Sequence, residues 1–373
     1  MITTDCLIIG GGVIGLMIAY ELRSAGLDVI VVERGTIGRE SSWAGGGILS
    51  PLYPWRQDDA ITALTGWSQN QYPILADILF AETAIDPEWT QSGMLILDCE
   101  DADSAIAWSK RYQHAVEVLE NRDIRDLVSF VSATDVQALW FSDIAQIRPP
   151  RLMQALKKYT ERMGVTLLEH TAITRFLADR HCMAGVETET ERIATKQIVI
   201  ACGAWSGTLL QPLHYSLPVE PVRGQMILFR ATADLLKPMI HYQNHYLIPR
   251  RDGRILAGST VEYVGFDKST TPTKILELKE FAIRLLPALN NIPIEHDWAG
   301  LRPGSPKGIP FIGPHPTRNG LFINAGHFRN GITLAPASAR LMADWILARQ
   351  PIFDVSPFSL ESTPSSRIHS FLH

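Results

Sequence analysis

Residues 6–33 read CLIIGGGVIGLMIAYELRSAGLDVIVVE, and this stretch decides the fold. Residues 7–9 form a short apolar run, which is typical of a buried parallel strand. Glycines interrupt the run, and apolar residues spaced four apart from position 14 to 22 predict a helix that ends at Gly26. Residues 28–33 predict a second strand. The chain therefore opens with one βαβ unit of about 30 residues.

The turn between this strand and helix carries the pattern Gly-x-Gly-x-x-Gly at Gly10, Gly12 and Gly15. The first glycine permits a tight turn, the second lets a pyrophosphate approach the backbone, and the third lets the helix pack closely on the strand. Glu33 ends the second strand, where a carboxylate would accept hydrogen bonds from ribose hydroxyls. The pattern predicts a dinucleotide site. By itself it does not separate NAD from FAD.

Two further segments favour FAD. Residues 39–47 form a polar, glycine-rich loop after the second strand, and residues 198–206 form a buried strand that ends in small residues. A second Gly-x-Gly-x-x-Gly pattern is absent from the sequence, so an organic substrate would have to reduce the flavin. The cofactor-binding residues predicted in this part of the chain are Gly10, Gly12, Val13, Ile14, Gly15, Glu33, Arg34, Ser41, Ser42, Ala44, Gly45, Gly46, Gly47, Ile48, Cys202, Gly203 and Trp205.

Composition describes an ordinary globular chain. Its 373 residues are 46% hydrophobic and 20% charged, with a formal net charge of -5, which argues against nucleic-acid binding by counterion release. Four cysteines lie far apart, as expected of reduced thiols in a cytoplasmic protein, and they suggest no zinc site. The uncharged stretch 6–20 contains four glycines, Asp5 precedes it directly and no basic residue does, and the uncharged stretch 197–219 contains Gln211, His214 and two prolines, so we expect no signal peptide or membrane span.

The order of the predicted elements indicates two domains. Periodicity predicts helices at residues 60–79, 102–119, 152–163, 273–286 and 333–349, and strands at 165–168, 197–201, 226–230, 246–248, 254–257 and 321–324. Parallel-type strands lie at both ends of the chain and antiparallel-type strands between them. We therefore expect an α/β fold with a discontinuous Rossmann-like domain (1–86, 141–216 and 300–349), an inserted, mainly antiparallel substrate domain (87–140 and 217–299) and a loose tail (350–373).

Four segments together carry a family resemblance: IIGGGVIG with its downstream VVERG, SSWAGGGILSP, HYLIPRRDGRILAGST with WAGLRPGSPKGIPFIG, and GHFRNGITLAPASA. They resemble the D-amino-acid oxidase family of FAD-dependent oxidoreductases, and within it the glycine oxidases of thiamine biosynthesis. The resemblance reaches to about Arg349. It implies FAD as cofactor, and the absence of a Cys near WAGLRPG implies that the FAD is not covalently tethered.

The resemblance also implies the substrate site. Arg302 would clamp the substrate carboxylate with a bidentate fork, Tyr246 would add its hydroxyl, and Arg329 would lie near substrate and flavin, its role being open between carboxylate contact and local potential. Amides at the start of the helix after Arg329 would face the flavin's pyrimidine edge. Further cofactor-binding residues implied in this way are Ile173, His327, Arg329, Asn330, Gly331, Ile332 and Thr333. Metal ligands are not expected.

The hypothesis that follows is oxidative deamination of a small amino acid such as glycine, sarcosine, D-alanine or D-proline. The α-hydrogen would pass as hydride to flavin N5, the imine would hydrolyse to oxoacid and ammonia, and oxygen would yield hydrogen peroxide. Two alternatives stay open: a D-amino-acid dehydrogenase with another electron acceptor, and a non-catalytic flavin-binding redox sensor. A closed homo-oligomer is a family expectation.

Overall fold

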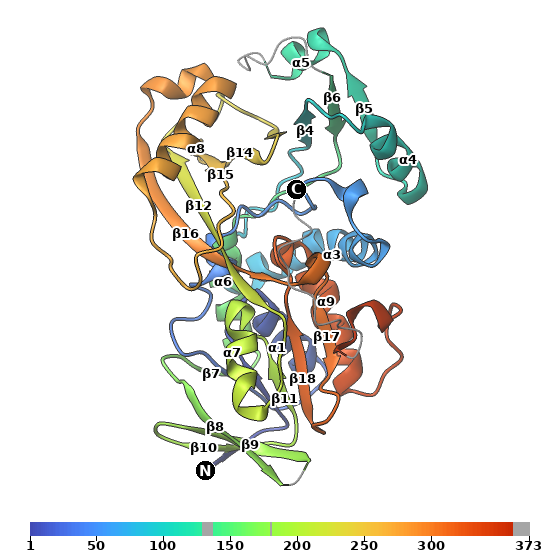
Figure 1. Cartoon of the computed structure of the whole chain (residues 1–373), viewed down its shortest axis with the longest axis vertical. Coiled ribbons are helices and arrows are strands. Elements are labelled where there is room, and N and C mark those ends of the chain that lie inside the picture. Colours follow the sequence, from blue (N-terminus) through green and yellow to red (C-terminus); the bar gives the residue numbers. More distant parts are fainter. Residues whose placement is uncertain (129–136, 180, 361–373) are drawn as a thin grey trace.

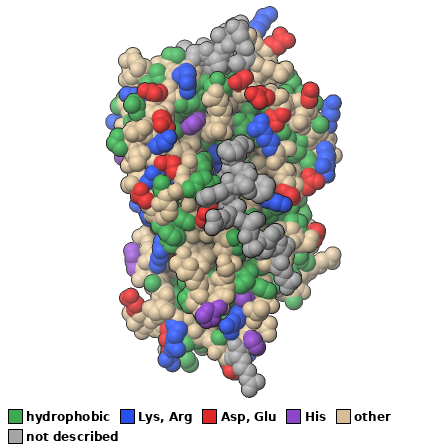
Figure 2. All heavy atoms as spheres, in the orientation of Figure 1, with side chains coloured by type: hydrophobic (Ala, Val, Ile, Leu, Met, Phe, Trp, Pro, Cys, Tyr) green, Lys and Arg blue, Asp and Glu red, His purple; other side chains and the backbone are tan. Residues whose placement is uncertain are grey.

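In the computed structural model two large sheets lie one above the other along the long axis of the molecule (Figure 1). The structure describes residues 1–128, 137–179 and 181–360. The mixed α/β class expected from the sequence is confirmed. On the face shown in Figure 2, acidic and basic side chains are interspersed, as expected from a net charge of only -5.

The nucleotide-type sheet has six strands in the order β17-β18-β11-β2-β3-β7. Neighbouring strands are parallel except β17 and β18, which are antiparallel. All four residues of β2 and of β3 are buried, which explains their unbroken apolar sequences. The strands are β2 (Cys6–Ile9), β3 (Val29–Val32), β7 (Thr166–Leu168), β11 (Ile198–Ile200), β17 (Phe311–Pro314) and β18 (Leu321–Ala325).

Helices cover one face of this sheet, where alternate residues of β2 such as Cys6 and Ile8 share a core with the apolar sides of the helices. The helices of this part of the chain are α1 (Val13–Ser24), α2 (Ser41–Ala44), α3 (Asp59–Thr83), α6 (Pro149–Arg162), α9 (Gly331–Ile346) and α7 (Ser206–Leu210), and the Leu210 side chain of α7 packs on the opposite face of the sheet. On the other face Leu7 and Ile9 pack toward a small sheet of order β1-β10-β9-β8. Its strands are β1 (Ile2–Thr3), β8 (Ile173–Asp179), β9 (Cys182–Thr188) and β10 (Arg192–Ala194).

The other large sheet has eight strands in the order β16-β12-β15-β14-β13-β4-β6-β5. Its neighbouring strands are antiparallel except β13 and β4. The strands are β4 (Met94–Leu97), β5 (Val116–Leu119), β6 (Ala138–Phe141), β12 (Glu220–Phe229), β13 (Met239–Tyr242), β14 (His245–Pro249), β15 (Ile255–Gly258) and β16 (Ile294–Gly304). Helix α8 (Pro272–Leu285) packs on it, and α4 (Ala102–Tyr112) and α5 (Asn121–Leu127) lie near its β5 edge (Figure 1).

Two local expectations are wrong. The helix expected over residues 102–119 ends at Gln113, which has φ +60°, and the chain then forms β5, which pairs with β6. The start of the expected loose tail is packed, because Phe358 and Leu360 are buried in the core; residues 361–373 lie outside the described residues. The domain boundaries stay a prediction, and the one at 299/300 falls inside the continuous strand β16.

Candidate active site

A cavity of ≈ 700 Å³ lies where the two large sheets meet. Its wall takes residues from the carboxyl ends of β2, β3 and β11 and from β12, β14 and β16. Such crevices at strand ends are where open α/β sheets bind ligands. Every residue predicted for the cofactor or substrate lines this cavity except Gly15. The structure therefore brings together segments that lie up to about 320 residues apart in the chain.

Gly15 supports the turn from below rather than facing the cavity. A Cβ there would lie 1.9 Å from the carbonyl oxygen of Gly10, so only glycine lets α1 pack this closely on the turn after β2. Gly10 itself has φ +114°, and a Cβ on it would lie 2.4 Å from the carbonyl oxygen of Ala201 on the next strand. Both positions match the packing reasons that the sequence pattern suggests for glycine.

Two polar groups of this turn are already partnered. The Val13 amide donates to the Ser42 hydroxyl at 2.9 Å, so helix α2 is fastened to the first turn of α1. Glu33 accepts from the Gly11 amide through Oε2 and from the Gly35 amide through Oε1, each at 2.9 Å. Each carboxylate oxygen keeps a second lone pair, so Glu33 is fixed in place and still able to accept from a ribose.

The wall near Glu33 is built from aromatic and cationic side chains. The Arg34 guanidinium lies over the Trp205 ring, 4.0 Å from its centroid. The Cys202 thiol donates to the Ile9 carbonyl at 3.0 Å, and burial raises the pKa of this thiol to about 12. Cys202 is therefore a protonated structural thiol at neutral pH. Ile173, at the start of β8, completes this end of the cavity.

The segment predicted as a polar loop is partly helical. Residues 41–44 form helix α2, and the loop proper begins at Gly45. Trp298 of β16 donates from Nε1 to the Ala44 carbonyl at 3.0 Å, which ties this segment to the eight-stranded sheet. The Thr333 hydroxyl of α9 donates to the Ile48 carbonyl at 3.0 Å. This segment is thus held from both sides of the cavity.

Arg302 and Tyr246 lie close together at the end of the cavity away from Glu33. Arg302 donates from Nη1 to the Thr260 carbonyl at 3.0 Å and from Nη2 to the Ser259 hydroxyl at 2.6 Å. The Tyr246 side chain lies beside this guanidinium. Burial, followed by the nearby positive charge of Arg329, lowers the pKa of Arg302 to about 10, while Tyr246 opposes this shift.

The two cations at this end of the cavity, Arg302 and Arg329, have no anionic partner among the described residues. Arg302 and Arg329 form no ion pair within 4.0 Å in the part of the chain that the structure describes. The Nη2 atom of Arg329 is buried without a hydrogen-bond partner, and burial lowers the pKa of Arg329. Buried charges of one sign are costly unless something neutralises them. This end of the cavity therefore carries positive charge that no described carboxylate neutralises within 4.0 Å.

The GHFRNG segment, which leads into α9, forms another part of the cavity wall. His327 is buried, its Nε2 lies 2.7 Å from the Ser338 hydroxyl, and burial lowers its pKa to about 3, so the imidazole is neutral at pH 7. Because the Ser338 hydroxyl donates to Asn324 Oδ1 at 2.8 Å, we assign the proton to His327 Nε2. Asn330 caps α9, and Gly331, Ile332 and Thr333 form its first turn on the cavity wall.

Sequence reasoning missed three residues that shape the Arg302 site. Ser259 and Thr260 supply its hydrogen-bond acceptors, and Gly224 of β12 leaves room for it. A Cβ on Gly224 would lie 2.2 Å from Nη2 of Arg302. This contact depends on the pairing of β12 with β16, a register that no local motif reveals. Tyr53 and Arg56, from the segment between α2 and α3, also line the cavity unpredicted.

The residues present fit FAD. A glycine turn leads into the N-terminus of α1, Glu33 is poised for a ribose, and the helix start at Gly331 faces the same cavity as the two arginines. The three features suit the phosphates, the ribose and the electron-rich edge of a flavin, respectively. In the part of the chain that the structure describes, no helix is long and apolar enough to cross a membrane.

Comparison with known proteins defines the class. A family model described as "FAD dependent oxidoreductase" (DAO) matches residues 5–345, and the chain belongs to this family. The predicted FAD cofactor and the prediction of an FAD-dependent amino-acid oxidase are thereby confirmed.

Three relatives give the resemblance its detail. Glycine oxidase from Pseudomonas putida is 45% identical over 355 residues, covering 95% of this chain and 97% of that protein. The crystal structure of glycine oxidase from Geobacillus kaustophilus superposes with a TM-score of 0.93 at 30% identity, covering 98% of this chain and 100% of that one. A bifunctional protein ThiO/ThiG from Trichormus variabilis is 32% identical over 100% of this chain, which spans 57% of that protein.

Proposed function

We propose that this enzyme oxidises glycine, and more slowly other small amino acids such as sarcosine, D-alanine and D-proline. The observation that carries the proposal is the pair of buried arginines, Arg302 and Arg329, that lack a carboxylate partner among the described residues. A small amino acid brings such a carboxylate. The names of the relatives, glycine oxidases among them, support the same substrate.

Arg302 holds the substrate by its carboxylate. Its two hydrogen bonds to Ser259 and Thr260 fix the guanidinium plane, so the fork presents one geometry to the anion. Tyr246 adds a hydroxyl at the same place. Holding the carboxylate orients the α-carbon and its hydrogen, and such positioning supplies much of the rate. The FAD, when bound, accepts the α-hydrogen together with its electron pair.

The rest of the reaction needs little from the protein. Loss of a hydride from the α-carbon and a proton from the amine turns glycine into its imine, which water hydrolyses to glyoxylate and ammonia, and oxygen takes up the two electrons and two protons to give hydrogen peroxide. If the amine binds in its neutral form, its lone pair assists the departure of the hydrogen. His327 is neutral at pH 7 because burial lowers its pKa, so it adds no positive charge to the cavity wall.

The same proposal covers the biological role. In the ThiO/ThiG relatives one polypeptide contains a region similar to this whole chain together with a second part. We propose that the product of glycine oxidation feeds formation of the thiamine thiazole. The cytoplasmic location, the non-covalent attachment of FAD and a homo-oligomeric state stay predictions.

One anaerobic experiment tests the reaction. Glycine, sarcosine, D-alanine and D-proline are each added to the yellow holoenzyme without oxygen, and the flavin absorbance is followed before air is admitted. We expect glycine to bleach it fastest and air to restore the colour with one peroxide per cycle. Bleaching that only a quinone or dye reverses would indicate a dehydrogenase. A flavin that no amine bleaches would overturn the proposal and favour a sensor.

A further inference from the structure

Arg250 immediately follows β14 and differs from the other arginines of its turn. It donates from Nη2 to the Gly46 carbonyl at 2.6 Å, and from Nη1 to Gln146 Oε1 at 2.8 Å and to the Ile147 carbonyl at 3.2 Å. All three acceptors are neutral. Burial lowers the pKa of this guanidinium to about 10. Because its partners are neutral, this buried guanidinium fixes the geometry of the groups that it binds and does not neutralise a carboxylate.

Gly46 lies against three side chains that alternate along β14 and the residue after it. Tyr246, Ile248 and Arg250 are two residues apart, so in extended chain they point the same way. A Cβ placed on Gly46 would lie 2.9 Å from Ile248 Cδ1 and 3.3 Å from the Tyr246 hydroxyl oxygen. Arg250 holds the carbonyl of the same glycine. The strand that carries the carboxylate-binding tyrosine thus lies directly on the loop that we expect to face the FAD.

The guanidinium also spans two segments of the nucleotide side. The Ile147 amide donates to the Gly47 carbonyl at 2.8 Å, and Ile48 pairs with Gln146 in an antiparallel bridge. Arg250 binds a carbonyl on each side of this pairing, Gly46 on one and Ile147 on the other. Removing it would break the hydrogen bonds to both segments at once.

We propose that Arg250 is a positioning residue that fixes the backbone of Gly46 against the Tyr246 hydroxyl, and so sets the spacing between the FAD-facing loop and the carboxylate-binding end. The part that concerns Tyr246 rests on the proposed function. The part that concerns the Gly45–Gly47 loop rests on the contacts alone. Arg250 therefore acts through Gly46 and need not contact substrate.

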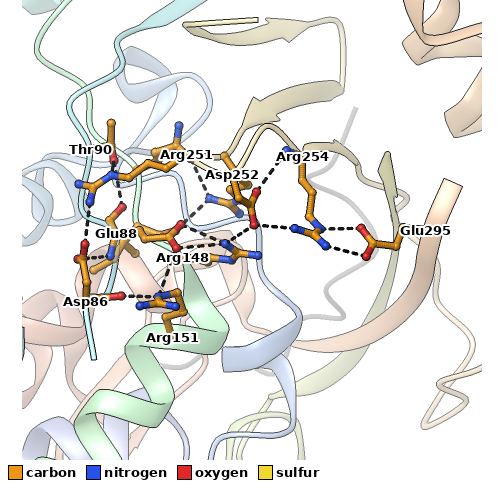
Figure 3. A network of polar contacts seen from close by, with 12 residues as sticks. Asp86, Glu88, Thr90, Arg148, Arg151, Arg251, Asp252, Arg254 and Glu295 are labelled. Atoms are coloured by element: carbon orange, nitrogen blue, oxygen red, sulfur yellow. Dashed lines mark hydrogen bonds and ion pairs between the residues drawn. The ribbon is translucent and has the colours of Figure 1, made fainter. Parts of the chain in front are cut away.

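The same turn offers a matched control. Arg254 donates to Asp252 Oδ2 at 2.9 Å and to Glu295 Oε2 at 2.5 Å, and Figure 3 shows it pointing away from Glu88 and Arg148 toward Glu295. Neither of its partners lies in the cavity wall. Replacing either arginine with Met keeps most of the stem and removes the guanidinium, so the two variants differ in whether Gly46 loses its partner.

The experiment compares Arg250→Met with Arg254→Met. FAD dissociation is measured by the return of flavin fluorescence, and glycine KM and kcat are measured at saturating FAD. For Arg250→Met we expect FAD to bind about tenfold more weakly and KM to rise about tenfold, because charge-assisted hydrogen bonds to the loop are lost, while kcat falls less than about threefold. For Arg254→Met we expect every value within about twofold of the parent.

Arg250→Lys keeps the test decisive if the Met variant does not fold. Its single ammonium cannot span Gly46, Gln146 and Ile147 as the fork does, so we expect partial recovery of FAD affinity and KM. An FAD dissociation constant within twofold of the parent in a folded Arg250 variant would overturn the proposal. If the parent enzyme fails to oxidise glycine, the proposed function fails, but the FAD measurement still reports on Arg250.

Discussion

Two groups of arginines lie near the two ends of strand β14, and they differ in whether carboxylates pair with them. Beyond its carboxyl end, Arg148, Arg251 and Arg254 each lie within 4.0 Å of a carboxylate in one connected network (Figure 3). Near its amino end, Arg302 and Arg329 have no carboxylate within that distance among the described residues. Arg148, Arg251 and Arg254 are thus paired with carboxylates, whereas the two arginines in the cavity wall have no such partner among the described residues.

Arg302→Ala tests this comparison with the largest expected effect. Losing the charged partner of a buried carboxylate costs about 4 kcal/mol, so kcat/KM for glycine should fall about a thousandfold. FAD affinity should change little, because Arg302 lies at the opposite end of the cavity from the Gly10 turn. Steady-state kinetics and flavin fluorescence measure the two quantities. Turnover on glycine that equals the parent's would show that the unpaired arginine is not the carboxylate clamp.

Gly224→Ala tests the same site without touching its charges. The new Cβ would lie 2.2 Å from Arg302 Nη2, so the guanidinium must move, and a displacement of about 1 Å can cost about a hundredfold in kcat/KM. The control is Gly66→Ala in α3, where a Cβ meets no atom within 4 Å. It should leave kinetics unchanged and raise the free energy of unfolding by up to about 1 kcal/mol. Equal kinetics in both variants would contradict the prediction.

Gly224 is also an example of a site residue that could not be predicted from the sequence. The turn that holds Gly10 and Gly12 and the position of Glu33 are local, because a strand, a turn and a helix in sequence impose their own packing, and the place of these three residues in the cavity wall could be predicted. Arg302 was predicted from a family resemblance, but its partners Ser259 and Thr260 come from a strand end about 40 residues away. The β12–β16 register that places Gly224 under Arg302 follows from the whole sheet. The edge strand β5 has no buried residue, so its short sequence shows no clear apolar alternation that would indicate a strand.

The positive charges of the cavity also affect the pKa of a buried histidine, His241. His241 is fully buried, both of its ring nitrogens lack a hydrogen-bond partner among the described residues, and its ring lies 4.5 Å from that of Tyr53. Burial, followed by the nearby charges of Arg329, His245 and Arg56, lowers its pKa to about 3. In the unfolded chain the pKa is about 6.5. Between these values the unfolded state binds a proton that the folded state does not.

His241→Leu should therefore stabilise the protein most in acid. Stability from the neutral imidazole is present above pH about 6.5 and is lost as pH falls toward 3, so at pH 5 the cost is about 2 kcal/mol. The variant removes this cost and buries no unpartnered nitrogen. Its Tm should exceed the parent's at pH 5 by more than at pH 8. A difference in Tm that does not depend on pH would contradict the assigned neutral state.

The smallest effect is expected at the paired end of β14. Arg254→Met removes the contacts with Asp252 and Glu295, which are partly exposed, so Tm should fall by only about 2 °C at low salt. Salt near 1 M screens such pairs and should abolish the difference from the parent. The same salt should raise the parent's glycine KM, because added anions compete for Arg302 and Arg329. If salt left KM unchanged, the cavity arginines could not be the free anion site that their lack of partners indicates.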